Sequence, residues 1–195
     1  MSSNPYKNTP ESDWKEITAK LVSEHPLTPY LKDIVLDSWQ GIFDTTIGRD
    51  RLNIGIDIFP RPQIIGALLH ELVPASIEKT FPGKWRKEQN KNDKDIVCEY
   101  ENKLSIELKT SSNATKIFGN RSYAQPYDGE GKIKDGFYLA VNFESFSKGN
   151  PRPKILKIRF GWLAHTDWIA QKASTGQQSR LGAFTYENKF ITLYG

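Results

Sequence analysis

Hydrophobic residues recur at helical spacing along residues 1–82. Three such runs are present, and each follows a proline at a position that commonly opens a helix. These prolines are Pro10, Pro29 and Pro62. We therefore expect three helices, the last of which is kinked or restarted at Pro74, because proline lacks the backbone N–H that a helix interior needs.

From residue 83 onward, apolar and polar residues alternate in the manner typical of strands. Strands are expected at 95–100, 104–110, 136–143, 154–162 and 190–194. Only residues 101–103 separate the first two, which indicates an antiparallel hairpin closed by a tight turn. A short helix is expected from Thr166, whereas the stretch 44–62, with its prolines and glycines, fits either a strand or an extended arm.

The whole pattern predicts an α/β (α+β) fold, in which a central mixed β-sheet is flanked by helices and the N-terminal part is helical. We expect a single domain over residues 1–195, mainly helical in 1–82 and strand-rich in 83–195, because a chain of 195 residues suits one compact core. Hydrophobic residues make up 37% of the chain and charged residues 26%, which excludes a disordered protein.

Composition also limits where the protein works. Cys98 is the only cysteine, which excludes an internal disulfide, and the polar N-terminus lacks the order of a secretory signal. No apolar run reaches the roughly 20 residues that a membrane-spanning helix needs. We therefore expect a cytoplasmic protein without membrane association. The formal charge of +4 permits a polyanionic partner but does not require one.

The strand expected at 104–110 carries the most informative residues. Alternation places Ser105, Glu107 and Lys109 on one face and apolar residues on the other. Asp95 lies twelve positions before Glu107, so the hairpin would bring the two carboxylates close enough to share a divalent cation. Mg²⁺ prefers oxygen ligands and keeps several waters when a protein supplies only one or two carboxylates, and one such water is a ready nucleophile. The sequence therefore predicts a Mg²⁺ site for phosphodiester hydrolysis.

Lys109 has two possible roles beside that site. Its ammonium could orient the attacking water and balance charge on the scissile phosphate, or it could act as a base if burial lowers its pKa. A simpler interpretation is that Glu107 and Lys109 form a weak ion pair on a solvated strand face. We favour the catalytic interpretation because the flanking alternation indicates a central strand, and a polar, glycine-containing loop follows it.

The histidines offer no competing metal site. His25, His70 and His165 each stand alone in the sequence, without the spacing of a zinc site, and surface or capping roles are expected for them.

Asp95 followed by Glu107-Leu108-Lys109 resembles the Asp…Glu-x-Lys signature of the PD-(D/E)xK nuclease superfamily. The proline of that name is absent, since Lys94 stands before Asp95. A wider run, from Ile54-Gly-Ile-Asp-Ile-Phe-Pro-Arg-Pro to Gly119-Asn-Arg-Ser-Tyr-Ala-Gln125, is similar to type II restriction endonucleases, in particular those grouped with ScaI.

The resemblance implies a central mixed sheet, Mg²⁺ held by Asp95, Glu107 and the carbonyl of Leu108, and Lys109 as the catalytic lysine. Such nucleases often add a carboxylate from an upstream helix, for which Glu71 and Glu78 are candidates. We prefer Glu71, because it lies among leucines, where an unpaired carboxylate would be costly unless a cation answered it. The alternative is a glutamate at a helix edge in water.

The loop that follows the catalytic strand is expected to contact DNA. Arginine and lysine can bind guanine edges or phosphates, and asparagine and glutamine can bind adenine. The alternative is a flexible, solvated loop, but its position directly after the predicted site favours DNA contact. The candidates are Ser111, Ser112, Asn113, Lys116, Asn120, Arg121, Ser122 and Gln125. A second basic group, Lys84 to Lys94, could follow the phosphate backbone or form a charged edge strand.

Together these features predict a type II restriction endonuclease that hydrolyses phosphodiester bonds of double-stranded DNA at a short palindromic site with Mg²⁺. A homodimer would cut the two strands by symmetry, and a DNA methyltransferase for the same site is the implied genetic partner. Two alternatives remain open: a structure-specific repair or junction nuclease on the same fold, and a non-catalytic DNA-binding module in which Asp95, Glu107 and Lys109 form ordinary salt bridges.

Overall fold

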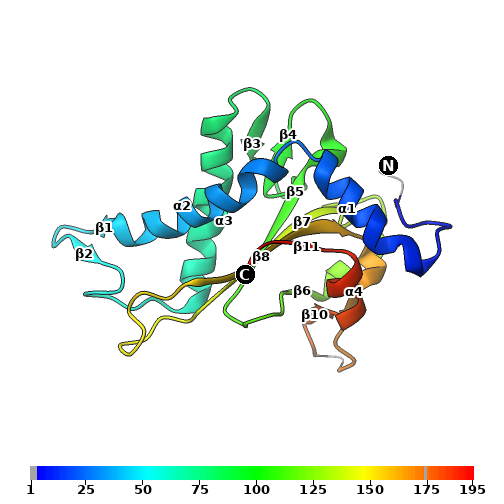
Figure 1. The fold of residues 1–195 in the computed structure, drawn as a ribbon. Coiled ribbons are helices and arrows are strands. Elements are labelled where there is room, and N and C mark those ends of the chain that lie inside the picture. The colour runs from blue at the N-terminus through cyan, green and yellow to red at the C-terminus, as the bar shows by residue number, and fades with distance from the viewer. Residues whose placement is uncertain (1–3, 174) are drawn as a thin grey trace.

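A computed structural model describes residues 4–173 and 175–195 of the chain (Figure 1). The three expected N-terminal helices are confirmed as α1 (Trp14–Glu24), α2 (Thr28–Asp44) and α3 (Pro62–Thr80). Pro29 and Pro62 lie in the first turns of α2 and α3, where no intrahelical N–H bond is lost. Pro74 lies inside α3, which continues through it as one helix.

A mixed sheet forms the centre of the molecule, as the sequence predicts. Among the described residues its order is β11 (Ile191–Tyr194), β8 (Ile155–Leu163), β7 (Gly136–Phe143), β5 (Ile106–Ser111), β4 (Ile96–Cys98) and β3 (Trp85–Lys87). Strand β5 pairs in parallel with β7, and the other neighbouring strands are antiparallel. The expected α/β class with a mixed central sheet is therefore confirmed.

Both faces of the sheet are buried, and β7 shows how. Phe137, Leu139 and Val141 pack with the N-terminal helices, whereas Tyr138 and Ala140 pack into a second apolar cluster. That second cluster is built partly by a small sheet, β6 (Phe118–Asn120), β10 (Gln178–Leu181) and β9 (Trp168–Ala170), and by the residues around the short helix α4 (Ala183–Asn188). A strand buried on both faces is almost continuously apolar, and in β7 Asn142 is the one polar side chain.

The stretch between α2 and α3 resolves as an arm. It holds a two-stranded ladder, β1 (Thr46–Ile47) and β2 (Leu52–Asn53), followed by a single bridge between Ile54 and Ile58. Figure 1 shows this arm reaching away from the sheet beyond the end of α2. No helix in the described part of the chain is long and apolar enough to cross a membrane.

Two local expectations are wrong. The connection between β4 and β5 is not a tight turn, because Asn102–Leu104 form a short 3-10 helix (η2), and Leu104 therefore precedes the strand. The helix expected from Thr166 is only a 3-10 turn, η4 (His165–Asp167), which leads directly into β9. Asp167 closes this turn by accepting a hydrogen bond from the backbone N–H of Ala164 at 2.8 Å.

Candidate active site

Strand β5 carries two of the predicted catalytic residues. The strand lies between β4 and β7, and its apolar residues Ile106 and Leu108 are fully buried on the helix side. Glu107, only 2% exposed, and Lys109 project from the other face, with Lys109 Nζ 2.7 Å from Glu107 Oε1. The same Nζ lies 3.3 Å from the Leu108 carbonyl oxygen. The strand is central and not solvated, as the catalytic interpretation requires.

Asp95 completes the predicted trio. Ile96 pairs with Ile106, so the antiparallel register, continued by one residue, places Asp95 opposite Glu107. The carboxylate of Asp95 is fixed from two sides. Its Oδ2 accepts a hydrogen bond from the Leu108 backbone N–H at 2.6 Å, and its Oδ1 lies 3.3 Å from Nδ1 of His70 on α3.

Helix α3 approaches the site closely because residue 66 is glycine. A Cβ on Gly66 would lie 2.8 Å from Thr110 Oγ1 of β5, so the bare backbone permits this contact. His70 stands one helical turn further along the same helix face and therefore reaches Asp95. No sequence pattern indicates this contact, because Gly66 and His70 are far from Asp95 along the chain.

Sequence reasoning also missed the residues that surround Glu107. The Tyr123 hydroxyl donates to Oε1, and Lys132 Nζ donates to Oε2 at 3.0 Å. Lys109 and Lys134 both lie over the Tyr123 ring, 4.5 and 4.7 Å from its centroid. Lys132 and Lys134 come from the segment that precedes β7, which no local pattern relates to β5.

Lys94, beside Asp95, adds another cation. Among the described residues its buried Nζ has no hydrogen-bond partner, although it lies 5.3 Å from the centroid of the Tyr138 ring. Gly136, at φ +140°, leaves the space that its side chain fills. Burial lowers the pKa of Lys94 to about 8, although the nearby charge of Glu107 opposes this.

The lysines around Glu107 shift the pKa values of the groups in this site. Burial alone would raise the pKa of Glu107, but the ammonium groups of Lys109, Lys132 and Lys94 outweigh it and leave the pKa lowered. Burial and the Glu107 charge raise the pKa of Tyr123, so its phenol remains a hydrogen-bond donor. Glu107 is therefore a permanent anion near neutral pH, as a metal ligand must be.

The donor set suits a hard cation. Asp95 and Glu107 offer carboxylate oxygens and Leu108 a carbonyl oxygen, the ligand types that Mg²⁺ prefers. In the part of the chain that the structure describes, no three His, Cys, Asp or Glu side chains gather to hold a metal. A cation held by Asp95 and Glu107 would thus keep several waters, which is usual for Mg²⁺.

Glu71 lies at the exposed edge of its helix, as the second of the two interpretations of this residue expects. Its side chain is 65% exposed and forms an ion pair with Lys87, so water and a lysine already stabilise its negative charge. Glu78 accepts a hydrogen bond from the backbone N–H of Lys87 at 3.1 Å. From α3, the residue that contacts the predicted trio is His70, not Glu71.

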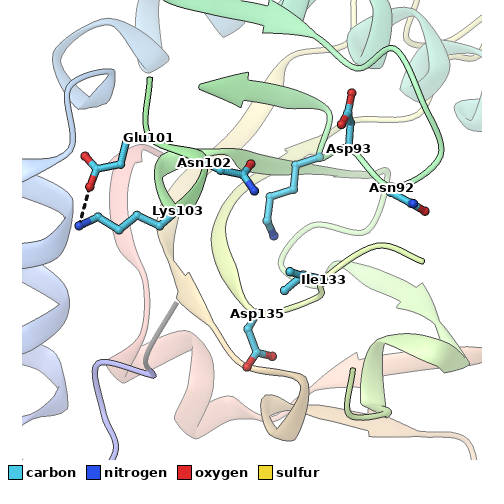
Figure 2. Close-up of a pocket in the computed structure, with 8 residues that line it drawn as sticks. Asn92, Asp93, Glu101, Asn102, Lys103, Ile133 and Asp135 are labelled. Carbon is cyan, nitrogen blue, oxygen red and sulfur yellow. Dashed lines mark ion pairs between the residues drawn. The ribbon is translucent and has the colours of Figure 1, made fainter. Parts of the chain in front are cut away.

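Two hollows lie beside the predicted trio, and several expected DNA-contact residues line them. One, of about 450 Å³, is bordered by His70, Ser111 and Ser112; the other, of about 250 Å³, is bordered by Lys109 and Asn120. Gln178 of β10 borders both, and sequence reasoning missed it because β10 is short and polar. A third hollow, of about 390 Å³, is bordered by Asp93, Ile133 and Asp135 (Figure 2).

The remaining expected contact residues take part in local structure. Arg121 Nη1 donates to the carbonyls of Ala173 at 3.3 Å and Gly176 at 3.4 Å, so its guanidinium clamps a neighbouring loop. Asn113 Oδ1 accepts the backbone N–H groups of Thr115 and Lys116 at 3.1 and 2.9 Å. Ser122 and Gln125 lie at the end of the 3-10 helix η3 (Arg121–Ala124), where the Gln125 N–H bonds the Ser122 carbonyl.

A mixed sheet with two carboxylates and a lysine at a central strand is characteristic of the PD-(D/E)xK nucleases that the motif resembles. Residues 4–194 match the sequence model of the family described as ScaI restriction endonuclease. The type II restriction enzyme ScaI of Streptomyces caespitosus is 45% identical over 196 aligned residues, which cover 99% of this chain and 86% of that relative. The chain therefore belongs to the ScaI restriction endonuclease family and is a type II restriction enzyme, a site-specific deoxyribonuclease.

Proposed function

We propose that the enzyme hydrolyses both strands of double-stranded DNA at a short palindromic site in a Mg²⁺-dependent reaction, with Asp95, Glu107 and Lys109 at the reacting centre. The observation that carries this proposal is the placement of two buried carboxylates and a lysine around one central strand. The family assignment supports it. We infer that the protein acts in the cytoplasm, beside a DNA methyltransferase that protects the same site.

In this proposal, Asp95, Glu107 and the Leu108 carbonyl hold the cation. Bound there, Mg²⁺ would supply Lewis-acid stabilisation of the phosphoryl charge and lower the pKa of a water. His70 and the Leu108 N–H fix the Asp95 carboxylate, and Tyr123 fixes Glu107. Each carboxylate therefore enters the reaction already oriented, which reduces the reorganisation that the transition state requires.

In this proposal, Lys109 contacts the scissile phosphate. Its side chain lines the hollow that Asn120 and Gln178 also line, so a phosphate lying there is within reach of the ammonium. The ammonium can donate a hydrogen bond to a phosphate oxygen and balance the negative charge that grows in the transition state. The hollow beside it, with Ser111, Ser112 and Gln178 at its border, is the proposed path for the bases.

Digestion of unmethylated plasmid DNA tests the reaction. The wild-type protein should give discrete fragments with Mg²⁺ and none with chelator, and Lys109→Ala should reduce the rate about 10³-fold because a transition-state charge contact is lost. Lys15→Ala, on the exposed face of α1, is the matched control and should cut at the wild-type rate. Cutting without a divalent cation, or full activity of Lys109→Ala, would contradict the proposal.

Two active sites related by symmetry would explain cutting of both strands, so we propose a homodimer. Analytical ultracentrifugation of the protein with a duplex carrying its site should show two chains for each duplex. One chain for each duplex, together with double-strand cutting, would exclude this arrangement.

A further inference from the structure

Both oxygens of the Glu107 carboxylate are already engaged within the protein. Oε1 receives Lys109 at 2.7 Å and the Tyr123 hydroxyl, and Oε2 receives Lys132 at 3.0 Å. The carboxylate is 3% exposed, and Lys132 is 14% exposed. Three donors occupy the carboxylate, and the ammonium on Oε2 competes with and repels a divalent cation at that oxygen, so strong cation binding at Glu107 requires one of these donors to leave.

Of the two lysines, Lys132 is the one that can leave. Lys109 extends from the central strand β5 and is held near Glu107 by the strand itself. Lys132 lies outside regular structure, just after Gly129 and Gly131, whose φ angles of +100° and +77° have open space around them. Figure 2 shows its neighbour Ile133 at the wall of the 390 Å³ hollow, so this segment has room to shift.

Lys132 also has a second acidic partner. Its Nζ lies 4.0 Å from Oε2 of Glu88, whose side chain is 43% exposed. A small movement away from Glu107 therefore keeps the ammonium close to a carboxylate. The desolvation cost of that movement is low, because Glu88 faces water.

The charges around Glu107 favour DNA over a cation as the first ligand. We call Glu88, Asp95, Glu107, Lys94, Lys109, Lys132 and Lys134 the Glu107 cluster. It contains four ammonium groups and three carboxylates, an excess of one positive charge. A dication approaching this cluster is repelled, whereas a phosphate is attracted.

We propose that Lys132 acts as an internal cation that occupies the metal-binding oxygen of Glu107 until DNA binds, and then contacts a DNA phosphate. This inference rests on the proposed function of the site. Its consequence is that DNA and the divalent cation bind cooperatively, because binding of either one reduces the electrostatic repulsion that opposes the other. Thermodynamic linkage makes this coupling reciprocal. Lys132 is thus a positioning residue that orders the assembly of the catalytic site.

Calorimetric titration with Mn²⁺ in the absence of DNA tests this proposal without measuring cleavage. Lys132→Gln should bind Mn²⁺ at least about tenfold more tightly than the wild-type protein, since the competing ammonium is gone. Lys134→Gln is the matched control, because it removes the same charge from the same segment but lies over the Tyr123 ring and not on Glu107. Its affinity for Mn²⁺ should change less than about threefold.

Two further titrations locate the cation and measure the coupling. Adding Asp95→Asn to Lys132→Gln should abolish the tight binding, which places the cation at Asp95 and Glu107. A duplex carrying the site read from the fragment ends should increase Mn²⁺ affinity strongly for the wild-type protein and weakly for Lys132→Gln.

Distinct outcomes separate this proposal from the proposed function. Suppose that plasmid cleavage needs Mg²⁺ and Lys109. If folded Lys132→Gln and Lys134→Gln then both bind Mn²⁺ like wild type, or both gain affinity equally, the role of Lys132 is refuted and the proposed nuclease function stands. If plasmid remains intact and Asp95→Asn has no effect on Mn²⁺ binding, the proposed site itself is refuted. Urea unfolding of each variant establishes that it is folded.

Discussion

Two buried clusters of lysine and carboxylate on this chain differ in balance. Lys189 donates to both oxygens of Asp167, at 2.8 and 2.9 Å, and its ammonium lies 4.2 Å from the centroids of the Tyr6 and Trp14 rings. This pair has one charge of each sign and connects the N-terminal segment to the turn η4. The Glu107 cluster has excess positive charge, a buried ammonium (Lys94) without a hydrogen bond among the described residues, and hollows beside it.

The difference separates stability from function. In a buried ion pair with one charge of each sign, each charge is neutralised by its partner within the protein. In a cluster with excess positive charge, one positive charge lacks a partner until an anionic ligand binds. We therefore expect the Asp167 pair to stabilise the fold, and we propose that the Glu107 cluster binds an anionic substrate. Removing a lysine should accordingly have opposite effects on stability in the two places.

The largest effect is expected at the Asp167 pair. Lys189→Met should lower the free energy of unfolding by about 3–5 kcal/mol, because it leaves the Asp167 carboxylate buried without a counter-charge. Urea denaturation at pH 7 measures this, with Lys157→Met on β8, a half-buried lysine, as the control. A loss below about 1 kcal/mol would show that this pair does not hold the fold.

A smaller effect is expected at His25, a buried side chain outside the Glu107 cluster that remains neutral. Its Nε2–H donates to the Leu104 carbonyl at 2.9 Å and its Nδ1 accepts the Leu27 N–H at 3.3 Å, so a second ring proton has no acceptor. Burial lowers its pKa to about 4. Of the two roles expected for His25, the surface role is wrong, because the side chain is buried and its ring packs against Phe137 and Phe160, whereas the capping role is confirmed, because His25 is the C-cap residue of α1 and its Nδ1 accepts the Leu27 N–H.

The pH dependence of stability follows from that shift. The unfolded chain takes up the His25 proton near pH 6.5 and the folded chain only near pH 4, so stability is complete above pH 6.5 and falls toward pH 4. Between pH 7 and 4.5 this group should cost the wild-type protein about 2 to 3 kcal/mol. Urea unfolding of His25→Gln should show a loss smaller by that amount; equal losses in both proteins would exclude His25 as the cause.

The opposite sign is expected within the Glu107 cluster. Lys94→Met should raise the free energy of unfolding by about 1 kcal/mol, because an apolar side chain replaces a buried ammonium that lacks a hydrogen bond. Cleavage should fall about tenfold, since positive charge near the phosphate is lost. Unfolding and plasmid digestion are measured on the same preparation. Destabilisation together with unchanged cleavage would reverse the contrast between the two clusters.

The smallest effect is expected at Glu71. Glu71→Gln should change stability by less than about 0.5 kcal/mol, because its ion pair with Lys87 is exposed. The rate of plasmid cleavage should remain within about threefold of wild type, whereas His70→Ala should reduce it more. A large loss of activity in Glu71→Gln would instead support a catalytic role for Glu71 and contradict the choice of His70 as the α3 residue that acts at the site.

Sequence periodicity predicted the parts of the fold that are long and apolar. Helices α2 and α3 follow their proline starts, whereas Pro10 precedes a 3-10 turn (Glu11–Asp13) and α1 begins only at Trp14. Strand β7 coincides with the expected 136–143, where eight consecutive residues are buried. The elements that were not predicted are short: α4 has six residues, and β6 and β9 have three each. Such segments are stabilised by tertiary contacts and carry little periodic signal of their own.

The same limit applies to the site. Asp95, Glu107 and Lys109 were predictable because one hairpin brings them together. Their further partners are separated along the chain by a helix or a loop: Tyr123 reaches Glu107 from η3, Lys132 from the following segment, and His70 reaches Asp95 from α3. Nothing in the spacing of these residues encodes the contacts, which exist only once the sheet and α3 have packed.

The close approach of α3 to β5 at Gly66 has a consequence for sequence variation. An alanine there would place its Cβ 2.8 Å from Thr110 Oγ1, so either the threonine hydroxyl must turn aside or the helix must move outward. Outward movement would carry His70 with it and lengthen its contact with Asp95. Gly66 also lines the 450 Å³ hollow that we propose as the path for the bases, so under the proposed function substrate access and the His70 contact limit the residues tolerated at position 66 as much as packing does.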